Sequence, residues 1–365
     1  MNTGYLVLET GEIFEGEWIG STKEMYGEVV FNTSMTGYQE MMTDPSYAGQ
    51  ILSFCYPLIG NYGLNEQDHE SKHIAVSGVI LNELCEEPSH FQSSHSFEDQ
   101  LKEENIPGLK NVDTRALVAA IRKHQTVKGK LVHSKEESHD HLKVLEDPHI
   151  PLVDHVSVKE FQTFQKHGPH VVLVDYGYKK SILDALLDKQ CRVTIVPYNT
   201  PLDKIDELEP DGILLSNGPG DPMKLTSSFS TIRALTEKYP TLGICLGHQL
   251  IALAYGAKTV KMPFGHRGGN HPVKDLLSGK VTMTSQNHGY VVVEESVDES
   301  IFQIQFRNVN DKSLEGIKHK YLPIQSVQFH PEGHPGPSDT TYIFQQFIDQ
   351  VVSAGGEKLC GSVTL

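Results

Sequence analysis

The second half of the chain alternates short apolar runs with amphipathic segments, and this alternation restricts the fold more than any other feature. Apolar runs bounded by turn residues predict strands, and apolar residues three and four positions apart predict helices. Repeated strand–helix units form a parallel sheet with helices on both faces. The expected elements are a strand over 170–174, a helix over 179–188, a strand over 192–196, a helix over 202–208, a strand over 212–215, a helix over 227–237, a strand ending at 244 and a helix over 246–255.

Shorter strands are expected after this region, near 281–283, 291–293, 302–306 and 324–329, and a helix is expected over 342–352. They look like hairpin additions to one side of the parallel sheet. The fold class is therefore α/β, with a mainly parallel sheet flanked by helices in the C-terminal domain.

Cys245 stands where the last of the four repeated strands changes into a helix. Gly243 and Gly247 bracket it, as a sharp strand-to-helix turn requires where a Cβ atom would clash. The free N–H groups and positive dipole at a helix start favour the thiolate, which is the nucleophilic form of cysteine. Many cysteines are only small apolar core residues, so further residues have to support a catalytic role.

His330 and Glu332 follow the strand expected over 324–329. A cysteine nucleophile needs an imidazole that stabilises the ion pair and protonates the leaving group, and a carboxylate that orients the ring. The ends of strands in an α/β sheet are where such groups converge. We therefore predict that Cys245, His330 and Glu332 form a catalytic triad.

A turn of fixed conformation follows the strand over 212–215, with Gly218 and Gly220 on either side of a proline. Glycines allow backbone N–H groups to approach a substrate carbonyl, and together with the N–H of Leu246 they would form an oxyanion hole. A Gly-Pro-Gly sequence alone indicates no more than a turn.

Together, the segments LSNGPGDP (215–222), GICLGHQ (243–249) and QFHPE (328–332) closely resemble the class I (triad) glutamine amidotransferases. The resemblance assigns Cys245, His330 and Glu332 to the triad. It also implies a pocket for glutamine lined by Ser46, Gly218, Gly220, Leu246, Gln249, Asn287, Gly289 and Tyr290. The segment 285–290 otherwise reads as a hairpin loop, and Tyr290 stands where the family often has phenylalanine.

The first part of the chain is predicted to be β-rich. Alternating residues over 4–9 and 13–19 predict a hairpin, and strands are expected over 28–32, 50–55 and 74–81. The segments 31–40 and 43–47 are crowded with small polar residues and would ordinarily form an exposed loop. An amphipathic helix is expected over 111–124.

Four segments of this first part, FNTSMTGYQE (31–40), TDPSY (43–47), IGNYG (59–63) and NVDTRAL (111–117), resemble the N-terminal domain of the carbamoyl-phosphate synthetase small-subunit family. The resemblance implies a smaller β-rich α+β domain over 1–131, a polar linker over 132–168 and a class I amidotransferase domain over 169–355. It also implies that ammonia from glutamine passes to a large subunit that makes carbamoyl phosphate from bicarbonate.

Composition supports two domains and excludes some partners. A chain of 365 residues suggests two cores, and a net charge of −16 argues against binding nucleic acid through its backbone. No apolar run approaches the roughly 20 residues of a membrane span, and the first residues lack a secretory signal. Five cysteines without CxxC pairs indicate neither disulfides nor zinc, so we expect a cytoplasmic protein without membrane contact.

Metal and cofactor sites are not expected in this chain. The histidines over 133–167 lack ligand spacing, and the glycines between His266 and His271 rule out a helix that would present both to a metal. No P-loop is present, so ATP and Mg²⁺ are expected to be used by the large subunit.

Two alternatives stay open. One is another enzyme of the same fold, either a glutaminase that serves a different synthetase or a free-standing γ-glutamyl hydrolase. The leading domain argues against this alternative. The other is an inactive regulatory subunit, against which the intact triad argues. The sequence does not distinguish arginine from pyrimidine biosynthesis, nor a heterodimer from a higher oligomer of heterodimers.

Overall fold

The structure is a computed structural model in which residues 2–135 and 152–361 are described. The chain divides into two compact units. The first comprises Met1–Ile150 with Met262–Gly268, and the second comprises Pro151–Lys261 with Gly269–Leu365. The family resemblance placed the second domain at 169, whereas α4 (Val153–Val156) and β10 (Gln162–Phe164) precede that point within the expected linker. The linker histidines at 139, 141 and 149 lie outside the described residues.

The first unit is built on a closed barrel with the strand order β1-β2-β8-β6-β4-β3-β9. The predicted hairpin is present, since β1 pairs antiparallel with β2. The barrel strands are β1 (Thr3–Leu8), β2 (Ile13–Gly20), β3 (Met25–Asn32), β4 (Gln50–Phe54), β6 (Gly78–Ile80), β8 (Pro107–Lys110) and β9 (Val127–Val132). The remaining elements are α1 (Tyr38–Thr43), η1 (Pro45–Tyr47), β5 (Leu58–Ile59), β7 (Glu83–Leu84), α2 (Phe97–Glu103) and α3 (Thr114–His124).

The expectation of an exposed loop is confirmed for residues 33–36 but is wrong for residues 38–47. The segment contains α1 and η1, whose residues are largely buried. Tyr38 stacks on Tyr62 with ring centroids 4.1 Å apart, and its hydroxyl donates to the carbonyl of Gly63. These aromatic contacts come from a segment 25 residues away in the chain, so local composition could not reveal the burial.

The second unit is organised around a sheet with the order β10-β12-β11-β13-β14-β19-β18-β17-β15-β16. The strands β12, β11, β13 and β14 are parallel to their neighbours in this series, as predicted. The strand β19 was expected among the hairpin additions, but it also runs parallel to β14. Their bounds are β11 (His170–Asp175), β12 (Arg192–Pro197), β13 (Gly212–Leu215), β14 (Thr241–Ile244) and β19 (Ile324–Val327). The helices between them are α5 (Lys180–Asp188), α6 (Leu202–Asp206), η3 (Pro222–Ser228), α7 (Phe229–Lys238) and α8 (Leu246–Ala254).

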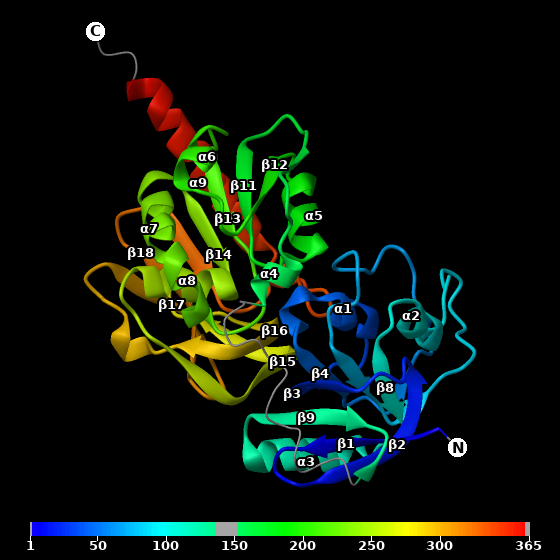
Figure 1. Ribbon diagram of the computed structural model, residues 1–365. Helices are drawn as coiled ribbons and strands as arrows, with labels where there is room; N and C mark the ends of the chain where they lie inside the picture. The colour runs from blue at the N-terminus through cyan, green and yellow to red at the C-terminus, as the bar shows by residue number, and fades with distance from the viewer. Residues whose placement is uncertain (1, 136–151, 362–365) are drawn as a thin grey trace. The chain divides into compact units, whose positions relative to one another are not determined.

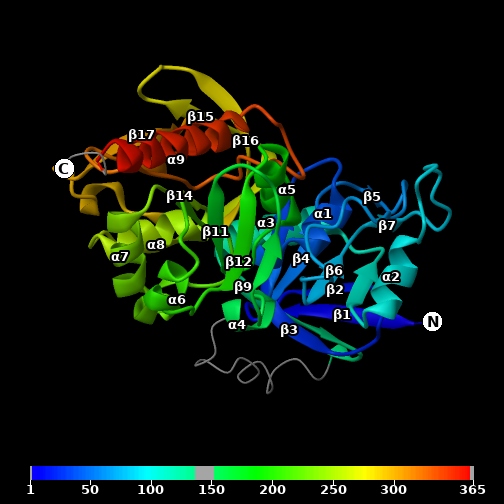
Figure 2. The ribbon, with the colours of Figure 1, turned by 90° about the horizontal axis from the view of Figure 1, so that it is seen from above.

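Helices cover both faces of the parallel part of the sheet (Figures 1 and 2). On one face α5 packs with the C-terminal helix α9 (Tyr342–Gly361) in a core that includes Ile182, Leu186 and Phe347. On the other face α6, α7 and α8 form a second core with residues such as Ile205, Ile232 and Ile251. Continuous apolar strands are buried on both sides for this reason.

The antiparallel side of the sheet departs from the prediction. The segments expected as two short strands with a loop over 285–290 form one strand, β16 (Val281–Val292). The glycine-rich segment before it lies in β15 (Thr259–Asp275), and the strand β18 (Leu314–His319) was not predicted. The strand β17 (Phe302–Asn308) was expected, and η4 (Glu294–Ser296) precedes it. Among the described residues, no helix combines the length and apolar character needed to span a bilayer.

Candidate active site

Three loops meet at the carboxyl ends of neighbouring parallel strands. Cys245 follows β14, the Gly218–Gly220 turn follows β13, and His330 follows β19. The strands β13 and β19 both flank β14 in the sheet. Three segments that are far apart in the sequence are therefore brought to one edge of the sheet, as the βα pattern predicted.

The turn at Cys245 has a backbone conformation that few side chains adopt, with φ 51° and ψ −101°. The Cys245 N–H extends the strand pairing by donating to Val327 at 2.8 Å, while the Gly247 N–H donates to the carbonyl of Ser216 at 3.0 Å. A Cβ atom on Gly247 would lie 2.2 Å from the Leu215 carbonyl oxygen. The helix start therefore packs directly on the end of β13, and only glycine fits there.

The Leu246 N–H is the first of helix α8 and has no acceptor within the helix. Gly218 lies against the Leu246 side chain and the Tyr176 backbone, since a Cβ atom on Gly218 would lie 3.0 Å from Leu246 Cδ2 and 2.2 Å from the Tyr176 carbonyl oxygen. Gly220 has a φ of 90°, which favours glycine. These are the positions from which backbone N–H groups are expected to stabilise an oxyanion.

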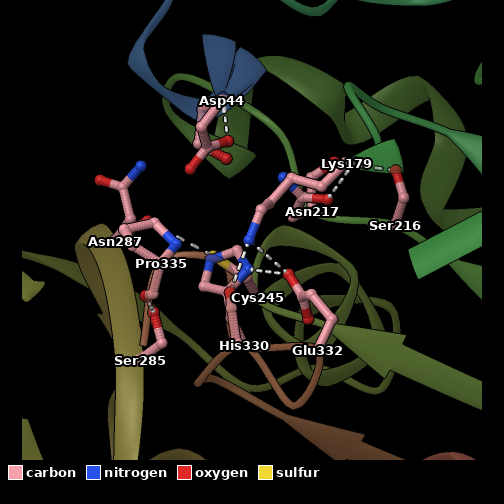
Figure 3. A network of polar contacts seen from close by, with 12 residues as sticks. Asp44, Lys179, Ser216, Asn217, Cys245, Ser285, Asn287, His330, Glu332 and Pro335 are labelled. Carbon is pink, nitrogen blue, oxygen red and sulfur yellow. Dashed lines mark hydrogen bonds and ion pairs between the residues drawn. The ribbon is translucent and has the colours of Figure 1, made fainter. Parts of the chain in front are cut away.

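The three predicted triad residues lie together and are buried (Figure 3). The His330 Nδ1–H donates to Glu332 Oε1 at 2.6 Å. The opposite ring nitrogen, Nε2, interacts with the Cys245 thiol and has no other partner in the described part of the chain. The order carboxylate, imidazole, thiol is the one that a cysteine nucleophile requires.

The pKa values of the two buried partners move in opposite directions. Burial alone would lower the pKa of His330, but the Glu332 carboxylate and the Cys245 sulfur outweigh it and raise the pKa of the ring. Burial alone would raise the pKa of Glu332, but the charges of Lys179 and His330 outweigh it and lower the pKa of that carboxyl. The pair is therefore held as imidazolium and carboxylate at neutral pH.

Lys179 is a site residue that the sequence reasoning missed. Its ammonium group is buried, with Nζ 3.1 Å from Glu332 Oε1 and 2.8 Å from the Gly333 carbonyl oxygen. Figure 3 shows Lys179 and His330 pointing at Glu332 from two sides. The available signal was its position just after β11, at the same sheet edge as the three motifs.

The turn before Lys179 is held by Asp175, the last residue of β11. Asp175 Oδ1 accepts from the N–H groups of Gly177 and Tyr178, both at 2.8 Å. Burial raises the pKa of Asp175, and these backbone N–H groups act against that rise. The turn therefore fixes the direction in which the Lys179 side chain leaves the backbone.

The residues expected to bind glutamine in the second unit also lie around Cys245. The thiol is 3.8 Å from the Asn287 carbonyl oxygen, and Gln249 Nε2 donates to the Tyr290 carbonyl at 2.9 Å. Asn287, Gly289 and Tyr290 all belong to β16. The His330 N–H joins this strand by donating to the Ser285 carbonyl oxygen at 2.9 Å. The strand that replaces the expected loop thus runs beside the triad.

Ser46 belongs to the first unit, within η1. Its backbone N–H donates to Asp44 Oδ1 at 2.9 Å, which caps this short helical turn. The side chain is mostly buried within the structure. Its role in binding glutamine remains an inference from the family resemblance.

His248 lies three residues after Cys245 and does not fit the role of the catalytic base. It lies in α8, where Nδ1 is 2.9 Å from Ser326 Oγ. The side chain is fully buried, and burial lowers the pKa of His248 to about 3. A ring that stays neutral throughout the physiological range does not hold a thiolate in an ion pair.

The low pKa of His248 gives a prediction about acid stability. Between pH 7 and pH 4.5 the unfolded chain gains a proton at this residue that the folded chain does not, so the folded state loses about 2.5 kcal/mol. In His248→Gln this loss is absent. The stability difference between wild type and variant should therefore shift by that amount over the interval, measured by urea unfolding at each pH. A constant difference would contradict a neutral His248.

The cysteines give a second prediction. A glutamine-like electrophile such as a chloroketone should label Cys245 alone among the five cysteines at neutral pH, as peptide mass spectrometry would show. Burial raises the pKa of Cys55 and of Cys191 to about 11, so both thiols stay protonated. Excess glutamine should protect Cys245. Preferential labelling of Cys55 or Cys191 would remove Cys245 from the catalytic role.

Comparisons with known proteins agree with the arrangement of the two units. Residues 6–131 match the family described as carbamoyl-phosphate synthase small chain, CPSase domain, and residues 172–350 match glutamine amidotransferase class-I. The carbamoyl phosphate synthase arginine-specific small chain of Halalkalibacterium halodurans is 50% identical over 359 residues, covering 97% of this chain and 98% of that protein.

Two small chains of Bacillus subtilis are similar over the same extent. The arginine-specific chain is 49% identical and the pyrimidine-specific chain is 48% identical, each covering 97% of this chain and 98% of the relative. Such identity over nearly the whole length includes both units. The chain therefore belongs to the carbamoyl-phosphate synthase small chain family, and its second unit is a class I glutamine amidotransferase domain.

Proposed function

We propose that this chain hydrolyses the side-chain amide of glutamine through a γ-glutamyl thioester on Cys245. The observation that carries the proposal is the buried row of Glu332, His330 and Cys245, with Nδ1 of the ring committed to the carboxylate. Nε2 of the same ring faces the thiol. The proposal gives each of the three residues one role in a two-step reaction.

In the first step the Cys245 sulfur attacks the carbonyl carbon of the amide. The N–H groups of Leu246 and of the Gly218–Gly220 turn stabilise the oxyanion. The imidazolium of His330 gives its proton to the nitrogen, the C–N bond breaks and ammonia leaves. In the second step His330 accepts a proton from water, which attacks the thioester, so that glutamate leaves and the thiolate is restored.

Glutamine would lie between the Cys245 turn and β16. Gln249, Asn287, Gly289 and Tyr290 would hold its α-amino and α-carboxylate groups, and Ser46 would be supplied by the first unit. This assignment rests on the family resemblance, supported by the contacts of Gln249 and Cys245 with the β16 backbone.

We further propose that ammonia passes to a large, ATP-dependent subunit that makes carbamoyl phosphate from bicarbonate. Ammonia released into water is protonated and ceases to be a nucleophile, so a closed route to a partner is needed. ATP and Mg²⁺ are assigned to that partner, and no cofactor or metal to this chain. We place the complex in the cytoplasm, as a heterodimer or a higher oligomer of heterodimers that supplies arginine biosynthesis, pyrimidine biosynthesis or both.

Purification of the native chain through an affinity tag tests this assignment. A much larger ATP-binding protein is expected to copurify in equal amount, and the complex should form glutamate and carbamoyl phosphate from glutamine, bicarbonate and ATP. An isolated chain that cleaves γ-glutamyl peptides as fast as glutamine would instead favour a free-standing hydrolase. A complex that uses ammonium salts but never glutamine would favour an inactive regulatory subunit.

A further inference from the structure

Gln328 occupies a buried position beside the catalytic sulfur. It follows β19 directly and precedes His330 by two residues. Its neighbours Val327 and Phe329 pack in the core on the α5 and α9 side of the sheet. Because side chains alternate along an extended segment, Gln328 points to the opposite side, where it meets α8. The residue is completely inaccessible to solvent.

The side-chain amide of Gln328 makes two hydrogen bonds. Its Oε1 accepts from Gln249 Nε2 at 3.0 Å, and its Nε2 donates to Cys245 Sγ at 3.6 Å. Both partners come from the turn and first helical residues after β14. Gln328 therefore joins a residue of the expected glutamine pocket to the nucleophile.

The direction of these bonds is fixed by the backbone. Gln249 Nε2 also donates to the Tyr290 carbonyl oxygen, which can only accept. The NH₂ group of Gln249 must therefore face Tyr290 and Gln328, so the oxygen of Gln328 faces Gln249. The remaining NH₂ group of Gln328 is thereby directed at the sulfur, and reversing either amide would place two acceptors or two donors against each other.

We propose that Gln328 is a catalytic residue whose amide N–H stabilises the thiolate of Cys245, both when the sulfur attacks glutamine and when it leaves the thioester. A donor that contacts the charged form of a group favours that form over the neutral one. His330 supports the same thiolate from its own side. The inference rests on the proposed glutamine hydrolysis, because it concerns the nucleophile of that reaction.

A consequence concerns Gln249. Both hydrogens of its amide are used, one by the Tyr290 carbonyl and one by Gln328. Only its oxygen is left for glutamine, and an oxygen accepts from the α-ammonium group or the amide NH₂ of the substrate. Gln249 and Gln328 thus act as one unit, in which the first contacts glutamine and the second contacts the sulfur.

The rate at which iodoacetamide alkylates Cys245 at different pH values tests the proposal without needing glutamine turnover. In Gln328→Met, which keeps the length of the side chain but lacks the donor, the midpoint of the alkylation profile should rise by about one pH unit, as expected for one hydrogen bond to a charged group. The acid limb of kcat/KM for glutamine should move by the same amount. Ser326→Ala is the matched control, since Ser326 lies in β19 two residues before Gln328 and contacts His248 instead of the sulfur.

A second variant guards against misfolding of the first. Gln328→Glu has the shape of the native residue and can still accept from Gln249, but it places a carboxylate oxygen against the sulfur. Its midpoint should rise further than that of Gln328→Met. A profile of Gln328→Glu that coincides with wild type, with a native circular dichroism spectrum, overturns the role of Gln328. If the wild-type protein does not hydrolyse glutamine at all, the proposed function is overturned instead. Failure of the role of Gln328 and failure of the proposed function can therefore be told apart.

Discussion

Replacing Cys245 by serine is expected to abolish glutamine-dependent synthesis of carbamoyl phosphate by the complex and to leave synthesis from ammonium salts intact. Serine has nearly the same size, but its hydroxyl ionises far less readily than a thiol, and His330 is arranged to support a thiolate. Removal of a nucleophile of this kind lowers turnover by about a thousandfold or more.

Both activities of the Cys245→Ser complex should be measured on the same preparation, with gel filtration to show that the subunits stay associated. Cys85→Ser is a suitable control, because Cys85 lies in the first unit and is not fully buried. If ammonia-dependent synthesis disappears together with glutamine-dependent synthesis while the complex remains assembled, Cys245 is not confined to amide hydrolysis.

Replacing His330 by asparagine is expected to reduce glutamine hydrolysis by about 10³-fold to 10⁴-fold, because both proton transfers and the ion pair with the thiolate are lost. Asparagine can still accept or donate one hydrogen bond, so the loss should reflect chemistry more than packing. Measurement of kcat and KM for ammonia release from glutamine would check this, with thermal unfolding to compare stability.

Substitutions of Glu332, which is buried between His330 and Lys179, are the comparison variants for His330→Asn. Glu332→Gln keeps the shape and one acceptor for the ring, so its loss of activity should be smaller. Glu332→Ala is less informative, because it removes the acceptor oxygen as well as the charge that Lys179 contacts, and breaking such a buried pair costs about 3–5 kcal/mol of stability. Full activity of His330→Asn would require another base, and the neutral His248 does not supply one.

The parallel part of the second unit could be predicted because its signals are local. Apolar strands such as β11 and β13 are bounded by turn residues, and helices such as α5 and α8 have apolar residues at helical spacing. Parallel strands must have their carboxyl ends at one edge of the sheet, so motifs that follow β13, β14 and β19 must converge. The position of Cys245 required no knowledge of distant contacts, whereas β19, which carries His330 at its end, was expected as a hairpin addition and its parallel pairing with β14 is seen only in the structure.

The errors arose where distant contacts outweigh local composition. The polar segment over 38–47 folds into α1 and η1 because Tyr38 and its neighbours pack on a segment much further along the chain. The expected loop over 285–290 continues as β16 because its backbone bonds to His330 and Gln249. Composition indicates how strongly a residue prefers a turn, but the tertiary structure determines which group forms hydrogen bonds with its backbone N–H and C=O.

The sequence by itself predicted the residues proposed as nucleophile, base and orienter, because each role needs a particular residue type at a strand end. Only the tertiary structure decided which other groups contact these three residues. Lys179 comes from the end of β11, and Gln328 is oriented through Gln249 by the carbonyl of Tyr290. The physical reason is that the protonation state of a buried group and the orientation of a buried amide depend on the groups that contact them, and those groups come close only when the chain folds.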